Sequence, residues 1–357
     1  MHQEGDKLRE NRKDEHVRLA LEQNRGISSH FDELHFVHRS FAEVGVRDVD
    51  LTVHTPHFSL RTPIYINAMT GGSEMTGKIN ASLAEVASAT GMAMAVGSQH
   101  AGIKNEQVRD TYKVVRKLNP KGIVFANVGA GSPVDFAQRA VDMLEADALQ
   151  IHVNVPQELV MPEGERDFAG WLKGIEEIVR TISVPVIVKE VGFGMSQETI
   201  KTLIDVGVRY VDVSGRGGTN FIGIENRRRK LGEYEYLQGW GQTTPISILE
   251  GRKFLGQVNL FASGGIRNPL DVAKALSLGA KACGIAGPIL KLVHESGTEG
   301  AIEEMNRWHE QLKSILTLLG VTSPEQLEKC PIVITGEVRQ WCELRGIDLM
   351  SLARREW

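Results

Sequence analysis

The sequence predicts a (β/α)₈ barrel, and three observations lead to this fold. Eight short apolar runs follow one another between residues 64 and 285, amphipathic stretches lie between them, and most runs end in small or polar residues. Strand-like runs that alternate with helices of about 10–15 residues indicate βα units, and eight such units indicate a closed barrel. The predicted strands are Ile64–Ala68, Met92–Val96, Ile123–Val128, Ala148–Val153, Pro185–Val188, Tyr210–Val213, Asn259–Ala262 and Ala282–Ile285.

A doubly wound open sheet is the alternative fold with the same alternation of strands and helices. The barrel is favoured because polar signals follow nearly every strand, and in a barrel all these strand ends meet at one mouth. In an open sheet, only the strands near the topological switch point would share a site. The predicted helices are Met75–Thr90, Gln107–Leu118, Pro133–Glu145, Trp171–Thr181, Ser196–Val206, Pro245–Phe254 and Pro269–Leu278.

The chain is expected to have three parts. Residues 1–62 form a charged arm, helix-prone to about residue 25, and a segment that closes the barrel; we expect the arm to act as a lid. Residues 63–295 form the barrel, and residues 296–357 form a C-terminal helical extension. The long connection between Ser214 and Pro245 interrupts the alternation of strands and helices. Connections of this length are usually functional lids or disordered.

Composition excludes several classes of protein. The 357 residues carry a net charge of −4, so no overall positive field attracts nucleic acid or anionic membranes. Cys283, Cys330 and Cys342 lack metal-binding spacing and indicate reduced thiols. The polar N-terminus lacks the apolar core of a signal peptide, and no apolar run is long enough for a membrane span. We expect a cytoplasmic protein without nucleic-acid or membrane partners.

Glycine-rich loops follow the last three predicted strands. Ser263-Gly264-Gly265-Ile266-Arg267 follows the seventh strand, and Ala286-Gly287-Pro288 follows the eighth. In many barrels these two loops form a phosphate site, because glycine lets backbone N–H groups approach phosphate oxygens. Ser214-Gly215-Arg216-Gly217-Gly218-Thr219 follows the sixth strand and can pass under a flat ring or cradle a phosphate. The phosphate would belong to FMN or to a sugar phosphate; a tight turn with a solvated arginine is the non-functional alternative.

The fourth predicted strand carries an unusual polar stripe. Its alternation places Gln150, His152 and Asn154 on one face, where barrels mostly carry branched aliphatic residues. Gln157 and Glu158 follow at the mouth. A single carboxylate can anchor Mg²⁺ when phosphate oxygens and waters complete the octahedron. The stripe therefore favours a site over isolated core groups.

Further polar groups lie at other strand ends. Lys189 ends the fifth strand, where its ammonium could stabilise the anion of a reduced flavin. The first three strands end in Asn67–Gly72, Gly97-Ser98-Gln99 and Ala126-Asn127, which suit a ring edge or a ribityl chain but are also ordinary turn residues. In the arm, Arg12-Lys13-Asp14-Glu15-His16 can place three cationic side chains on one helix face, although such runs are usually solvated.

Taken together, these motifs resemble those of the type II, FMN-dependent isopentenyl-diphosphate isomerases. They run in family order from residue 12 to residue 287. The glycine loops are shared with other FMN barrels, whereas the Arg-Lys pair and the His-x-Asn-x-x-Gln-Glu motif are specific to this family. The matching motifs are Arg12-Lys13-x-x-His16, Met69-Thr70-Gly71-Gly72, Gly97-Ser98-Gln99, His152-x-Asn154-x-x-Gln157-Glu158, Lys189-Glu190, Ser214-Gly215-x-Gly217-Gly218-Thr219, Ser263-Gly264-Gly265-Ile266-Arg267 and Ala286-Gly287.

The resemblance implies a reaction and its ligands. Isopentenyl diphosphate and dimethylallyl diphosphate would interconvert without net redox change, by protonation of the alkene and loss of a C2 proton over reduced FMN. NADPH or another reductant would reduce the flavin, Mg²⁺ would bind the diphosphate, and the protein would form a homotetramer or homo-octamer.

Residue roles follow from the same resemblance. Gln157, His152 and Lys189 are the expected catalytic residues, and Glu158 is the expected metal ligand. The expected substrate-binding residues are Arg12, Lys13, His16, Ser98, Gln99, His152, Asn154 and Gln157. The expected FMN-binding residues are Ala68, Met69, Thr70, Ser98, Asn127, Lys189, Ser214, Thr219, Gly265, Ile266, Arg267, Ala286 and Gly287.

Two other classes of protein stay open: other enzymes built on the same barrel, and non-catalytic binders. Another FMN barrel, such as a 2-hydroxy-acid oxidase, would need a histidine base in the loop after the sixth strand, and Ser214–Thr219 contains none. A nucleotide dehydrogenase would need a cysteine there, which is also missing. A non-catalytic binder of flavin or phosphate would need neither the polar stripe on the fourth strand nor the Arg-Lys-His arm.

Overall fold

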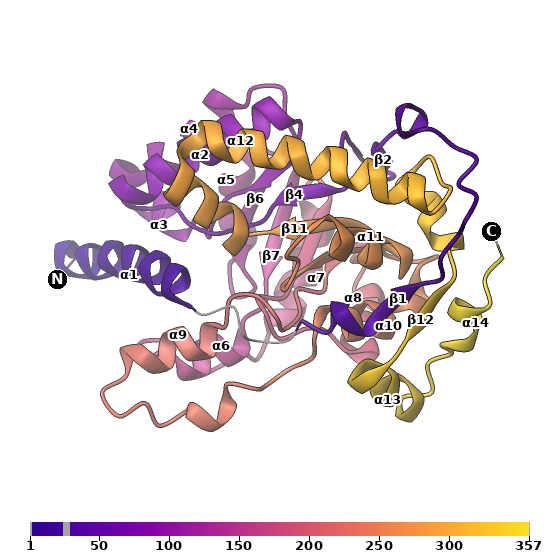
Figure 1. Cartoon of the computed structure of the whole chain (residues 1–357). Coiled ribbons are helices and arrows are strands. Elements are labelled where there is room, and N and C mark those ends of the chain that lie inside the picture. Colours follow the sequence, from indigo (N-terminus) through magenta and orange to yellow (C-terminus); the bar gives the residue numbers. More distant parts are fainter. Residues whose placement is uncertain (1, 24–28, 357) are drawn as a thin grey trace.

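The computed structural model describes residues 2–23 and 29–356, and of residues 2–11 only the backbone. Its centre is a closed barrel of eight parallel strands in the order β10-β11-β4-β5-β6-β7-β8-β9 (Figure 1). The strands are β4 (Ile64–Ile66), β5 (Ala93–Ala95), β6 (Val124–Gly129), β7 (Ala148–His152), β8 (Val186–Lys189), β9 (Tyr210–Asp212), β10 (Asn259–Ser263) and β11 (Ala280–Ile285).

The prediction of a barrel is confirmed, and the open sheet is excluded by one strand pair. The last barrel strand, β11, pairs in parallel with the first, β4, through Cys283 and Ile64 and the residues that follow them. Each of the eight predicted apolar runs overlaps one strand of the barrel. Residues 24 and 25, at the end of the predicted helical arm, lie outside the described residues. The arm before them is helix α1 (His2–Glu22).

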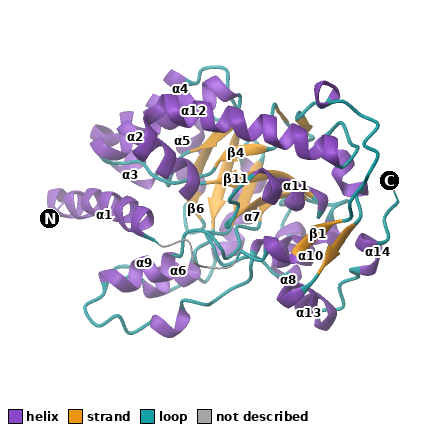
Figure 2. Ribbon diagram, viewed as in Figure 1, coloured by secondary structure: helices purple, strands orange, loops and turns teal. Residues whose placement is uncertain are grey.

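Helices cover the outside of the barrel, as Figure 2 shows. Capping side chains begin several of them: Ser73 accepts a hydrogen bond from Thr76 N, and Asn268 accepts one from Asp271 N, which satisfies N–H groups that the helix leaves free. The helices that follow the predicted stretches are α2 (Glu74–Thr90), α4 (Asp110–Leu118), α5 (Val134–Leu144), α7 (Trp171–Thr181), α8 (Gln197–Asp205), α10 (Thr244–Gly251) and α11 (Pro269–Ser277).

Three short helices lie at strand ends where no helix was predicted. They are α3 (His100–Lys104), α6 (Val155–Val160) and α9 (Phe221–Arg228). The long connection after β9 is therefore partly helical, because α9 and the 3₁₀ turn Glu235–Leu237 lie within it. The side chain of Asn220 begins α9 by accepting a hydrogen bond from Gly223 N. The three helices follow the carboxyl ends of β5, β7 and β9, so they lie around the mouth of the barrel.

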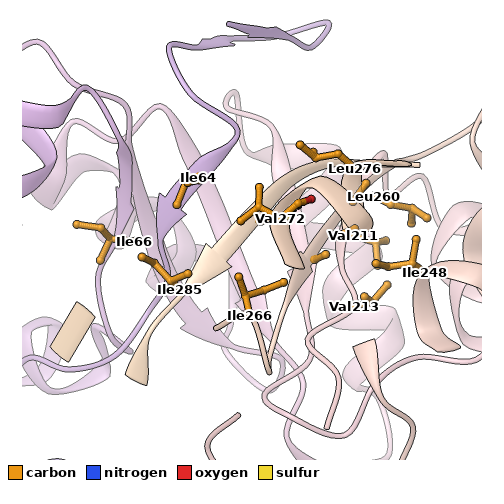
Figure 3. Close-up of a cluster of buried hydrophobic side chains, with 14 of the residues drawn as sticks. Ile64, Ile66, Val211, Val213, Ile248, Leu260, Ile266, Val272, Leu276 and Ile285 are labelled. Carbon is orange, nitrogen blue, oxygen red and sulfur yellow. Dashed lines mark hydrogen bonds between the residues drawn. The ribbon is translucent and has the colours of Figure 1, made fainter. Parts of the chain in front are cut away.

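The largest part of the core lies between the strands and the surrounding helices. Figure 3 shows side chains from neighbouring strands, such as Ile64 and Ile285, together with Val272 and Leu276 of α11. All are buried to 2% exposure or less. Because side chains alternate along a strand, the residue between Ile64 and Ile66 points into the barrel instead, and it is a buried tyrosine.

An aromatic cluster fills the amino-terminal half of the barrel. The hairpin of β2 (Val53–His54) and β3 (Ser59–Leu60) carries Phe58, which stacks on Tyr210 with ring centroids 5.5 Å apart. Phe58 also lies 5.7 Å from Phe125 and 6.4 Å from Phe261. Tyr210 Oη bonds His57 Nδ1 at 2.8 Å. The hairpin of residues 53–60 therefore plugs the amino-terminal end of the barrel.

The C-terminal extension contains more than the predicted closing helices. Helix α12 (Gly287–Leu318) begins directly after β11, inside the range predicted for the barrel, and runs into the extension after a bend at Gly297, whose φ is 68°. Strand β12 (Ile332–Ile334) then pairs antiparallel with β1 (Leu34–Phe36), a sheet that the sequence did not predict. Two short helices follow, α13 (Gly336–Leu344) and α14 (Met350–Ala353). Over residues 2–23 and 29–356, no helix is long and apolar enough to cross a membrane.

Phe58→Ala tests the aromatic plug. We expect the free energy of unfolding to fall by about 3–5 kcal/mol, since the substitution removes a buried ring and leaves a cavity. Thermal and urea unfolding would measure the change. Ser59→Ala, at an exposed position of the same hairpin, is the matched control and should change stability little. Equal unfolding curves for Phe58→Ala and the unchanged protein would show that the plug does not stabilise the barrel.

Candidate functional site

A buried carboxylate lies at the centre of the barrel, above the aromatic cluster. Asp212 ends β9 and accepts hydrogen bonds from Tyr65 Oη at 2.6 Å, Asn67 Nδ2 at 3.0 Å and Ser263 Oγ at 2.9 Å. The backbone N–H of Ser214 donates to it at 3.1 Å. Sequence reasoning missed Asp212, although an acidic residue inside a predicted strand was a visible signal. It connects three strands at the level where the polar mouth begins.

Lys189 is the cross-strand neighbour of Asp212. Its buried Nζ donates to Glu190 O at 2.7 Å. Burial lowers the pKa of Lys189, and the charges of Asp212 and Glu190 oppose that shift. Burial raises the pKa of Glu190 to about 7, although its carboxylate accepts backbone N–H bonds from the three residues 191–193. The side chain of Lys189 is therefore buried at the carboxyl end of β8, beside two acidic residues.

His152 and Asn127 form a hydrogen-bonded pair at the ends of β7 and β6. Asn127 Nδ2 donates to Val96 O at 3.0 Å, which leaves Asn127 Oδ1 to accept from His152 Nδ1 at 2.9 Å. Burial, then the charges of Lys189 and Lys13, lower the pKa of His152 to about 3. The imidazole is consequently neutral at physiological pH. It supplies a polar contact but no positive charge.

Gln99 and Ser98 follow β5 and have different surroundings. Gln99 is fully buried, donates to Ala140 O at 3.0 Å and accepts from Asn127 N at 2.9 Å. Both ends of its amide are therefore bonded within the protein, to residues of α5 and β6. Ser98 is only partly buried, and its carbonyl accepts a hydrogen bond from Tyr112 Oη at 2.8 Å.

Helix α6 presents the family-specific pair of residues. Asn154 Nδ2 lies 3.1 Å from Gln157 Oε1 and 3.0 Å from Glu158 Oε1, so it holds both side chains at the mouth. Glu158 Oε2 also accepts from Glu165 N at 2.8 Å. Within the described part of the chain, no group of three or more His, Cys, Asp or Glu side chains could hold a metal. A metal at Glu158 would thus need oxygens from a ligand.

Glu225 of α9 is the functional candidate that sequence reasoning missed most clearly. Its fully buried carboxylate accepts from Gln157 Nε2 at 2.9 Å and from Arg228 Nη1 at 2.6 Å, and its Oε1 lies 3.0 Å from His16 Nε2. Burial opposes ionisation of Glu225, but the contacts with His16, Gln157 and Arg228 outweigh it and lower its pKa. The only available signal was its place in the long connection after β9.

The arm docks on this cluster through charged contacts. Asp14 accepts from Ser73 Oγ at 2.6 Å, and Glu15 pairs with Arg228 at 3.2 Å. Beyond these, Gln23 bonds the backbone N–H and carbonyl of Asn220 at 2.9 and 2.8 Å. Helix α1 is thereby held between the start of α2 and α9 (Figure 1).

Two basic residues of the arm, Arg12 and Lys13, belong to its predicted binding motif. Burial, and then the charge of Arg12, lower the pKa of Lys13 to about 8. The charge of Lys13 in turn contributes to the lowered pKa of His152. Arg12 Nη1 lies 3.6 Å from Glu163 and from Met161 Sδ, while its Nε is buried and has no partner among the described residues. The arm therefore brings an incompletely paired guanidinium to residues 161–163, directly after α6.

The glycine loops after β9 and β10 pack directly on one another. Gly217, Gly264 and Gly265 have φ values of 123°, 87° and 75°, which disfavour other residues. A Cβ at Gly218 would lie 3.0 Å from Gly265 N, and one at Gly264 would collide with the backbone of the β9 loop. At the start of α12, a Cβ on Gly287 would meet nothing within 4 Å. The loops thus form a tight cradle beside an open helix N-terminus.

Arg267 has a different environment from the one expected. Its guanidinium makes two 2.8 Å hydrogen bonds to Asp32 and a 2.9 Å bond to Asp271. Its charge is therefore balanced by carboxylates of the protein. The Arg267 side chain thereby connects Asp32 to the β10 loop. The backbone N–H groups of the glycine loops lie beside it.

These features fit FMN. Thr70 Oγ1 and Gln150 Oε1 are buried polar atoms without a hydrogen-bond partner within residues 29–356 or the described part of the arm. Lys189 and Asn127 lie at the same strand ends, and the glycine cradle closes one side. A polar ring edge can satisfy such atoms, and the cradle suits a phosphate. The remaining expected contacts, Ala68, Met69, Ser214, Thr219, Ile266 and Ala286, follow β4, β9, β10 and β11 on the same rim.

Comparisons with known proteins identify the family of the chain. Residues 160–333 match the family model of FMN-dependent dehydrogenases. The chain is 52% identical over 344 residues to the isopentenyl-diphosphate delta-isomerase of Staphylococcus epidermidis, covering 96% of this chain and 99% of that protein. It is 52% identical to the Staphylococcus haemolyticus enzyme of the same name and 50% identical to that of Staphylococcus aureus, each over 96% of this chain and 98% of the other.

Solved structures show the same fold at low identity. A mandelate oxidase variant with an FMN adduct has a TM-score of 0.63 at 16% identity, covering 90% of this chain and 92% of the other. A flavocytochrome b2 variant has a TM-score of 0.65 at 19% identity, covering 96% of this chain and 85% of the other. Identity of 50–52% over nearly the whole length defines the family of the chain more narrowly than similarity of fold does. It belongs to the type II, FMN-dependent isopentenyl-diphosphate delta-isomerase family.

Proposed function

We propose that this protein interconverts isopentenyl diphosphate and dimethylallyl diphosphate at the mouth of the barrel, using FMN and Mg²⁺. The observation that carries the proposal is the docking of the arm. His16 Nε2 lies 3.0 Å from Glu225 Oε1, and Glu225 also accepts a hydrogen bond from Gln157. Residues that are specific to this family in the sequence thus meet at one place, although about 140 residues separate them along the chain.

The strand-end rim is the proposed FMN site. Thr70, Asn127 and Lys189 would contact the ring, and the backbone N–H groups of Gly265 and Gly287 would hold the phosphate. The bound reduced flavin would supply an electron-rich ring against which positive charge on the substrate is stabilised. The buried ammonium of Lys189 would balance the negative charge of that ring.

The arm and α6 would bind the substrate diphosphate. Arg12 and Lys13 supply positive charge in a protein whose net charge is −4, and charge-assisted hydrogen bonds to anions are the strong ones. Glu158 would hold Mg²⁺ together with diphosphate oxygens. Since the apolar part of the substrate has few carbons, most of the affinity must come from these charged contacts.

Gln157 would lie next to the reacting carbons. Its amide is fixed at both ends, since Nε2 donates to Glu225 and Oε1 accepts from Asn154. Glu225 then has two tasks, orienting Gln157 and anchoring the arm through His16 and Arg228. Closing of the arm would exclude water from a cationic transition state.

Other features remain part of the proposal. NADPH is the proposed reductant, the cytoplasm the proposed compartment, and a homotetramer or homo-octamer the proposed assembly. The fold alone would also suit a 2-hydroxy-acid oxidase, but the loop Ser214–Thr219 has no histidine to act as a base. A non-catalytic flavin binder would not need cations on a docked arm.

The isomerase assignment can be tested directly with the purified protein. We expect isopentenyl diphosphate to be converted only when FMN is reduced and Mg²⁺ is present, measured by product formation under anaerobic conditions. Samples with oxidised FMN or with chelator are the controls. Full turnover with oxidised FMN and no reductant would contradict the proposed mechanism, and oxidation of a 2-hydroxy acid would favour the alternative.

Glu158→Gln tests the proposed metal ligand. We expect at least a tenfold loss of activity and a higher Mg²⁺ concentration for half-maximal rate, because a neutral amide is a poorer ligand for a hard cation. Bound FMN should be retained. Glu165→Gln changes an exposed carboxylate seven residues away and is the matched control. An unaltered Mg²⁺ titration in Glu158→Gln would place the metal elsewhere.

Lys13 predicts a pH dependence of substrate binding. Its lowered pKa of about 8 means that the ammonium is charged below that pH and loses its proton as the pH rises through it. Between pH 8 and pH 9 we expect kcat/KM for isopentenyl diphosphate to fall several-fold, as about one ammonium in ten stays charged one unit above the pKa. Lys13→Arg should remove this fall, because a guanidinium stays charged.

The control for this profile is Lys104→Arg, at an exposed position of α3. It should keep the profile of the unchanged protein. If Lys13→Arg also kept that profile, another group would be responsible for the loss of activity at high pH.

A further inference from the structure

Residues 29–32, the first described residues after the arm, lie against the glycine loops and are held there by several contacts. Asp32 makes its two 2.8 Å bonds to Arg267 of the β10 loop, and Phe31 O accepts from Lys274 Nζ at 2.8 Å. His30 Nδ1 lies 3.3 Å from Thr243 Oγ1, at the start of α10. These contacts hold residues 30–32 against the β10 loop, α11 and the start of α10.

Ser29 is the residue of this segment that touches both loops. A Cβ placed on Gly217 would lie 2.8 Å from Ser29 Cβ, and one placed on Gly265 would lie 2.6 Å from it. The serine side chain thus occupies the space that the two glycines leave free. It is 0% exposed.

The hydroxyl of Ser29 has no hydrogen-bond partner within the described residues. Other buried serines near the barrel mouth are bonded: Ser263 Oγ donates to Asp212, and Ser247 Oγ accepts from Met195 N. Leaving a buried hydroxyl unsatisfied is unfavourable, and an alanine would fit the same space without that cost. A hydroxyl at this position indicates a ligand that accepts a hydrogen bond.

The charge distribution around the cradle identifies the kind of acceptor. Arg267 is balanced by Asp32 and Asp271, so its guanidinium is not free to neutralise an anion. An anion there must be held by backbone N–H groups, by the N-terminus of α12 and by neutral hydroxyl donors. Ser29 Oγ is such a donor, next to Gly265.

We propose that Ser29 Oγ donates a hydrogen bond to the phosphate of FMN, so that the segment after the arm forms one wall of the phosphate site. The proposal rests on the proposed binding of FMN at the barrel mouth and adds a ligand from outside the barrel. It also explains why Arg267 is paired with Asp32, since that pair holds Ser29 in place.

The test compares FMN with riboflavin, which has the same ring and ribityl chain but no phosphate. The full-length apoprotein is titrated with each, and binding is followed by quenching of flavin fluorescence. For Ser29→Ala we expect FMN to bind about tenfold more weakly or worse, since a hydrogen bond to a charged group is lost, and riboflavin to bind as before. Ser29→Cys keeps a weaker donor and should fall between.

Ser277→Ala is the matched control, because Ser277 is equally buried but donates to Lys274 O within its own helix. It should leave the affinities for both flavins unchanged. Equal weakening of FMN and riboflavin by Ser29→Ala would show a structural role, and no weakening would show that the hydroxyl does not contact the phosphate; either result overturns the proposal. If the unchanged apoprotein bound neither flavin, the proposed FMN function itself would fail.

Discussion

The buried carboxylate of Asp212 is the constraint on which the barrel interior depends. A charge without solvent is tolerated only when hydrogen bonds and a counter-charge surround it. Asp212 has both, from Tyr65, Asn67 and Ser263 and from the neighbouring Lys189. The same carboxylate opposes the effect of burial on the pKa of Lys189 and so favours its charged form. Asp212 lies between the aromatic cluster in the amino-terminal half of the barrel, which makes the barrel rigid, and the polar residues at the mouth, which form the candidate site.

A second buried carboxylate organises the mouth. Glu225 contacts side chains from three helices: Gln157 of α6, Arg228 of α9 and His16 of α1. Arg228 extends the cluster to Glu15 and Glu163. Removing one member of such a network leaves the others buried and unpaired, so its members stabilise the arm together. Arm closure and orientation of Gln157 are consequently linked, because both depend on one carboxylate.

The fold was predictable from local patterns, and the site only in part. Strand and helix periodicity, helix caps and glycine loops depend on neighbouring residues, so the eight barrel strands and the glycine cradle were found. The strand β12 was missed because its partner β1 lies about 300 residues away, at Leu34–Phe36. The ligand contacts of Gln99 and Arg267 were predicted from their positions after two barrel strands. In the structure Gln99 is bonded to Asn127 and Ala140, and two aspartates pair with Arg267.

The sequence by itself determined the barrel, the family and the rim of strand ends that bears the polar residues. Side-chain alternation and the backbone freedom of glycine are properties of short segments, which a sequence shows directly. Only the tertiary structure decided which charges meet. Asp32 and Arg267 are 235 residues apart, and Gln157 and Glu225 are 68 apart. Charged and polar side chains interact over a few ångströms, so whether a cation remains free for a ligand depends on partners that folding brings together.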